Sequence, residues 1–175
     1  MSSSLERVFR DVPDEIDESW THGVLVGGMA SAPDDLELAQ AYAEAAAQLI
    51  DLALESGEAW RLAYPIFYLS RHALELYLKA VVRPSRPRHE LRPLIEEFEK
   101  LLREQLHTAI PAHLKDDLLA FATVDPDAQG FRYSHTRVGK PRLLPGEYWV
   151  QLRDLQRFAD EVFDFIKDAL RRLPR

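Results

Sequence analysis

The sequence predicts an all-α protein, a bundle of four or five helices that follows an irregular N-terminal arm. Three observations support this fold class. Apolar residues recur with the period of an α-helix through most of the chain after residue 34. One of these stretches, residues 60–82, is apolar over most of its circumference, which is typical of a helix in the middle of a bundle. No segment shows the alternation of a strand with comparable clarity.

The composition is that of a single domain with an ordinary core. The 175 residues are 46% hydrophobic and 29% charged, with no cysteine. Disulfides, thiolate metal sites and thiol catalysis are therefore excluded. No apolar run is long enough for a transmembrane helix, and the first residues lack the pattern of a signal peptide. We therefore expect a cytoplasmic protein that is not bound to a membrane.

The net charge of −7 is unevenly distributed along the chain. Residues 1–60 hold thirteen acidic residues against two arginines, a balance of −11, whereas residues 61–175 have a balance of +4. The acidity therefore belongs to the N-terminal third, and the remainder of the chain can still bind an anion.

Residues 1–33 carry glycines and prolines without sustained periodicity, and we expect an extended or partly disordered acidic arm. The domain proper is expected over residues 34–175. Its first helix has Ser31 or Asp34 as candidate N-caps and ends at Ser56, with Gly57 as a left-handed C-cap.

The central helix is expected over residues 60–82. Its polar positions form a narrow stripe in which Arg71 and Glu75, and Glu75 and Lys79, are i,i+4 pairs. We expect this ionic stripe to face outward from an otherwise buried helix. Pro65 lies inside the pattern, so it must either begin the helix at its first turn or interrupt one backbone hydrogen bond.

Three more helices are expected, over residues 90–106, 113–123 and 147–173, the last with the longest unbroken apolar period. Before it, residues 124–146 form the longest irregular segment. Loops of this length inside a domain are usually functional or disordered, and the aromatic residues Phe131 and Tyr133 argue against disorder.

The residues able to do chemistry are concentrated in basic loops. No metal-ligand spacing, phosphate-binding glycine loop or nucleophile elbow is present, so we expect neither a metal nor a cofactor. Arg132, His135 and His89 are the candidate catalytic residues, because arginine can hold a phosphate and histidine can move a proton at neutral pH. Candidate substrate-binding or loop-orienting residues are Arg71, Glu75, Tyr133, Arg137 and Lys140. Alternatively, the loop is only a solvated basic segment, pinned by its aromatic residues, with Arg132 paired to an acid such as Glu75.

Three segments carry a family resemblance: YPIFYLSRHALELYLKA, HELRPLIEEF, and VDPDAQGFRYS before the last helix. Together they resemble a bacterial branch of the HEPN superfamily over about residues 36–172. The resemblance implies a helical bundle that acts as a homodimer in phage-defence, toxin–antitoxin or stress systems. It also implies metal-independent RNA cleavage, in which an arginine and a histidine help a ribose 2′-hydroxyl to attack and leave a cyclic phosphate.

Two functions from different classes follow. The first is a HEPN-like endoribonuclease with RNA as its partner. The second is a non-catalytic interaction module that binds a protein partner through its helices or its acidic arm, and it is favoured because Arg132 and His135 stand closer together than the family motif requires. If the arm masks a basic surface, deleting residues 1–30 should raise the affinity for nucleic acid. Nucleotide binding by the same basic residues is a third hypothesis, which the sequence does not separate from the first.

Overall fold

The protein is all-helical in the part of the chain that the computed structural model describes, residues 33–86, 88–135, 138–141, 144 and 146–174. Five α-helices lie in this part: α2 (Asp35–Ser56), α3 (Ala59–Val82), α4 (Leu91–Gln105), α5 (Ala112–Val124) and α6 (Leu152–Arg172). The predicted fold class is therefore confirmed. The arm expected over residues 1–33 lies, apart from its last residue, outside the described residues.

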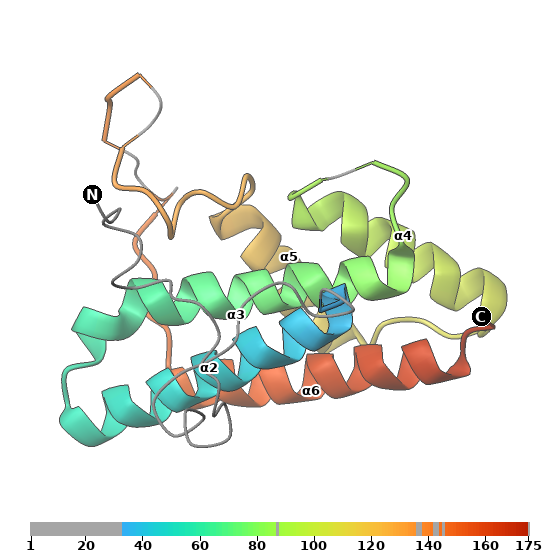
Figure 1. The fold of residues 1–175 in the computed structure, drawn as a ribbon, viewed down its shortest axis with the longest axis horizontal. Coiled ribbons are helices and arrows are strands. Elements are labelled where there is room, and N and C mark those ends of the chain that lie inside the picture. The colour runs from blue at the N-terminus through green and yellow to red at the C-terminus, as the bar shows by residue number, and fades with distance from the viewer. Residues whose placement is uncertain (1–32, 87, 136–137, 142–143, 145, 175) are drawn as a thin grey trace, which may run out of the picture. The chain divides into compact units, whose positions relative to one another are not determined.

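Helix α3 is the centre of the bundle. It packs against α2, α4 and α6, and Figure 1 shows it between α2 on one side and α4 on the other. Its buried apolar residues join the larger core cluster, which includes Leu74, Leu78, Phe98, Leu118 and Ile166. A smaller cluster fills the end of the bundle where α2 turns into α3, and it includes Ile50, Ile66 and Leu155.

The caps of α2 agree with the predicted boundaries. The Asp34 carboxylate accepts hydrogen bonds from the backbone N–H groups of Leu36 and Glu37, and the Glu37 side chain accepts from the Asp34 N–H. This reciprocal capping box satisfies N–H groups that have no partner within the helix. At the other end Gly57 has φ +69°, the left-handed conformation that favours glycine.

Two local expectations need correction or refinement. Pro65 lies in the interior of α3, six residues after Ala59, so it does not begin the helix. The last helix begins at Leu152 rather than at residue 147, and Gln151 before it has extended backbone angles. The apolar period itself starts at Leu152, whereas Trp149 is 92% exposed. Residues 147–151 therefore gain no burial from a helical conformation, and packing is what stabilises most helices in proteins.

No helix in the described part of the chain is both long enough and apolar enough to cross a membrane.

Candidate functional site

A buried ionic pair lies on the face of α3 that the sequence placed in solvent. The side chains of Arg71 and Glu75 are 2% and 1% exposed, and Arg71 Nη1 lies 2.9 Å from Glu75 Oε2. The expectation of an outward-facing stripe is therefore wrong for these two residues. The segments that precede α4 and follow α5 cover this face and provide partners for the charges, and burial without such partners would be costly.

Arg71 joins three segments of the chain through its guanidinium group. Its Nη2 donates to the backbone carbonyl of His89 at 2.8 Å, on the connection between α3 and α4. Its Nε donates to the carbonyl of Asp125 at 3.1 Å and lies 3.2 Å from the Asp125 carboxylate, just after α5. The planar guanidinium suits such a junction because its donors point in fixed directions. Asp125 was not predicted as a partner of Arg71, because the two residues are 54 positions apart in the chain.

Glu75 is the acceptor at the centre of this network. Besides Arg71, its carboxylate accepts from Lys79 Nζ at 2.7 Å and lies 2.9 Å from His89 Nδ1. Burial alone would raise the pKa of Glu75, but the hydrogen bonds from Lys79, His89 and Arg71, together with the charge of Lys79, outweigh it and hold the pKa below its usual value. Glu75 is therefore an ionised carboxylate inside the protein at neutral pH.

His89 is the exposed member of the network. Its side chain is 66% exposed although Nδ1 is held by the buried Glu75. An ionised carboxylate only accepts hydrogen bonds, so we assign the ring hydrogen of neutral His89 to Nδ1, which leaves a lone pair on Nε2. Among the described residues, Nε2 has no hydrogen-bond partner. This arrangement can take a proton from a group that approaches from solvent.

Asp125 also shapes the loop that carries Arg132. Its Oδ1 accepts from the N–H groups of Gln129 and Gly130, at 3.0 and 2.8 Å. A Cβ atom at Gly130 would lie 2.9 Å from Leu144 Cδ2, so the turn leaves little room for a side chain there. Phe131 follows and is 9% exposed, stacked on Phe67 of α3 with ring centroids 5.2 Å apart. Of the two aromatic residues expected to pin this loop to the core, Phe131 does so, whereas Tyr133 is largely exposed.

Arg132 lies over two tyrosine rings rather than beside Glu75. Its guanidinium carbon is 5.4 Å from the ring centroid of Tyr68 and 5.2 Å from that of Tyr133, which is 50% exposed. The ring of Tyr68 also stacks with that of His72, with centroids 5.7 Å apart and an interplanar angle of 7°. We call Tyr68, Arg132 and Tyr133 the guanidinium–tyrosine stack. The alternative in which Arg132 pairs with Glu75 is wrong, because Arg71 occupies that position.

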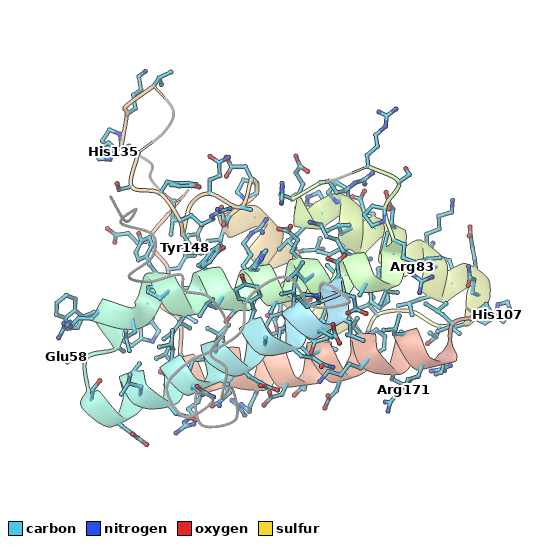
Figure 2. All side chains as sticks on the ribbon, in the orientation of Figure 1. Glu58, Arg83, His107, His135, Tyr148 and Arg171 are labelled. Carbon is cyan, nitrogen blue, oxygen red and sulfur yellow. The ribbon has the colours of Figure 1, made fainter. Side chains whose placement is uncertain are left out.

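The other candidate residues lie on the same loop beyond the stack. His135 hydrogen-bonds the Ser134 hydroxyl through Nδ1 at 2.9 Å and forms an isolated β-bridge with Pro141. Figure 2 shows His135 on a projecting part of the loop, away from the helices. Lys140 is exposed on this part of the loop, and Arg137 lies outside the described residues. The structure thus joins His89 to Arg71 and Glu75 and joins Arg132 to Tyr133, whereas His135 joins neither group.

The described residues contain no group of three or more histidine, aspartate or glutamate side chains placed to hold a metal ion together. Comparison of the chain with protein-family models, with curated proteins and with solved structures finds no match.

Proposed function

We propose that this protein is a HEPN-like, metal-independent endoribonuclease of bacterial defence or stress systems, and that His89 is the residue that moves the proton. One observation carries the proposal: a buried, ionised Glu75 holds Nδ1 of a histidine whose ring is largely open to solvent. A carboxylate in this position fixes the tautomer and the orientation of the ring and stabilises the imidazolium once it forms.

The proton balance of the cleavage is simple. Nε2 of His89 takes the proton from a ribose 2′-hydroxyl, and the 2′ oxygen attacks the adjacent phosphorus. The bond to the 5′ oxygen breaks, and a 2′,3′-cyclic phosphate forms. Protonated His89, held by Glu75, returns the proton to the leaving 5′ oxygen. Lys79 contacts the same carboxylate and is 15% exposed, and in this proposal its charge stabilises the reacting phosphate.

The guanidinium–tyrosine stack is the part of the site suited to hold the RNA strand. Exposed aromatic rings stack on bases, and a guanidinium can contact either a base or a phosphate. Tyr68 and Glu75 lie seven residues apart on α3, which is about 10 Å along a helix. A single strand bound at the stack could therefore reach His89. In this proposal Arg132 keeps its predicted role in binding, whereas His89 rather than His135 is the general base.

RNA cleavage in excess EDTA tests the proposal. We expect the wild-type protein to cut single-stranded RNA, to leave cyclic-phosphate ends, and to lose about a hundredfold or more of its rate in His89→Gln. His113→Gln is the matched control, because His113 is equally exposed and also contacts a glutamate, Glu161, but on the surface. Intact RNA with the wild-type protein, or equal rates in the two histidine variants, would refute the proposed activity.

A second candidate function, the interaction module, is favoured by a different observation. Large side chains are exposed near the start of α3 and before α6: Trp60 is 77% exposed and Trp149 is 92% exposed. Exposed tryptophans are frequent centres of protein interfaces. Light scattering across a range of concentrations, with Trp60→Ser and Trp149→Ser alongside, tests self-association. A mass that stays that of one chain in all three proteins would argue against a homodimer.

A further inference from the structure

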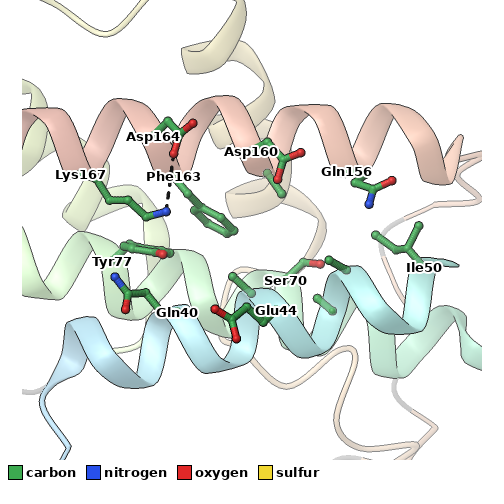
Figure 3. A pocket seen from close by; sticks show the side chains of 14 residues that line it. Gln40, Glu44, Ile50, Ser70, Tyr77, Gln156, Asp160, Phe163, Asp164 and Lys167 are labelled. Carbon is green, nitrogen blue, oxygen red and sulfur yellow. Dashed lines mark ion pairs between the residues drawn. The ribbon is translucent and has the colours of Figure 1, made fainter. Parts of the chain in front are cut away.

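A cavity lies between α2 and α6, with residues of α3 at its floor. Its volume is about 400 Å³, within the range of sites for small molecules. Figure 3 shows its length between the two helices, with Gln40 and Lys167 towards one end and Ile50 and Gln156 towards the other. None of the residues discussed above for RNA cleavage lines it.

Small side chains explain why the space exists. Helix α2 contributes Ala43, Ala46 and Ala47 to the lining, and α6 contributes Ala159. Larger residues at these positions would fill the gap between the helices, as protein interiors are normally filled. These four alanines therefore give the cavity a strip of methyl groups beside its polar and charged side chains.

The floor of the cavity carries a polar group without a partner. Ser70 of α3 is 5% exposed, it lines the cavity, and its hydroxyl oxygen has no hydrogen-bond partner among the described residues. Buried hydroxyl groups in proteins are normally hydrogen-bonded. Figure 3 shows Ser70 between Glu44 and Asp160, which come from α2 and α6 on its two sides.

The charge of the lining selects the sign of the ligand. Three carboxylates, Glu44, Asp160 and Asp164, face one ammonium, that of Lys167, which leaves a balance of −2. Lys167 is already engaged, 3.6 Å from Asp164 and above the ring of Tyr77. In the described part of the chain, neither Glu44 nor Asp160 forms an ion pair. Both side chains are exposed, so their carboxylates are available to a cation at the solvent-open side of the cavity.

We propose that this cavity binds a linear aliphatic polyamine. One ammonium group donates to the Ser70 hydroxyl oxygen and to the carboxylates of Glu44 and Asp160. The methylene chain lies along the alanines, parallel to the two helices. The shape, the strip of methyl groups and the two unpaired carboxylates each favour this class over an anion or a planar aromatic molecule. The proposal is independent of the proposed ribonuclease activity.

Isothermal titration of the full chain with spermidine in 0.15 M salt tests the proposal. At this ionic strength, attraction to scattered surface carboxylates is largely screened. We expect one saturable site, with a Kd about tenfold weaker in Ser70→Ala and in Glu44→Gln. Glu55→Gln is the matched control, because Glu55 is an exposed glutamate of the same helix that does not line the cavity, and its Kd should equal that of the wild type.

Further measurements keep the test decisive if a variant folds poorly. Circular dichroism reports the fold of each variant, and Ala47→Leu, which narrows the cavity without changing a charge, should also weaken spermidine binding. Butane-1,4-diol, which has a methylene chain but no charge, should give no heat of binding. The proposal is overturned if spermidine shows no saturable binding, if Glu44→Gln and Glu55→Gln bind equally well, or if Ser70→Ala leaves the Kd unchanged.

Discussion

Replacing Arg71 by methionine is the sharpest test of the buried network. Methionine keeps an unbranched side chain of similar length in the core but removes the guanidinium. The carbonyls of His89 and Asp125 then lose a donor, and the carboxylates of Glu75 and Asp125 lose their shared cation. The side chains of Glu75 and Asp125 are buried, so water cannot readily replace the lost donor.

The size of the stability loss in Arg71→Met depends on which hydrogen-bond partners Glu75 and Asp125 keep. Removing one member of a buried ion pair typically costs about 3–5 kcal/mol of folding free energy, whereas an exposed pair is worth roughly 0.2–1 kcal/mol. Glu75 keeps Lys79 and His89, and Asp125 keeps two backbone N–H donors. We therefore expect a loss at the lower end of the buried range, about 3 kcal/mol.

Urea unfolding monitored by circular dichroism measures this loss, and a double-mutant cycle assigns it to the pair. Glu75→Leu alone should cost a similar amount, because it leaves Arg71 with a single acidic partner. The Arg71→Met/Glu75→Leu protein should be far more stable than the sum of the two losses would allow, since no buried charge of the pair then lacks its partner. A loss below about 1 kcal/mol for Arg71→Met, or losses that simply add, would refute the reasoning.

Three further outcomes are expected. Burial lowers the pKa of His72 below its ordinary 6.5; the charge of Glu75 opposes this shift, and the charges of Lys79, Arg132 and Arg71 add to it. The unfolded chain therefore binds the proton more readily, so the stability of the protein should fall as the pH drops below about 6.5. Thermal unfolding across pH measures this fall, which should be smaller in His72→Phe. Ser70→Ala should raise the unfolding free energy of the ligand-free protein by about 1 kcal/mol, because it removes a buried hydroxyl that has no partner among the residues the structure describes. A clear loss in urea unfolding would contradict this. Asp34→Ala removes the capping box of α2 and should cost about 1 kcal/mol in the same assay, and an unchanged midpoint would show that the cap contributes nothing.

The helices could be predicted because their signals are local. The capping residue Asp34 and the left-handed Gly57 fix the ends of α2, and both depend only on neighbouring residues. The start of α6 was misplaced because Trp149 and Val150 extend an apolar run in the sequence without being buried in the fold. A run of apolar residues in the sequence does not show where packing against the bundle begins, and that packing sets the helix boundary.

The candidate site was harder to predict because its contacts join distant segments. Glu75 and Lys79 are i,i+4 neighbours, and that pair was predictable from spacing alone. The burial of Arg71 depends on Asp125, which lies 54 residues away, and on His89, 18 residues away. Nothing in the sequence around Arg71 distinguishes a buried arginine from an exposed one. Similarly, Arg132 and His135 are close in sequence, but Arg132 lies in the guanidinium–tyrosine stack and His135 lies on the projecting part of the loop.

Two adjacent residues of α3 show how differently the fold treats buried polar groups. Arg71 has its guanidinium nitrogens engaged with the buried Glu75 and with two other segments, so its burial is compensated within the protein. Ser70, one position earlier, is almost as buried, and its hydroxyl at the floor of the α2–α6 cavity has no hydrogen-bond partner within the described part of the chain. If both residues only stabilised the fold, removing either polar group would lower stability. We expect opposite signs, a loss at Arg71 and a gain at Ser70, because only the polar group of Arg71 has partners among the described residues.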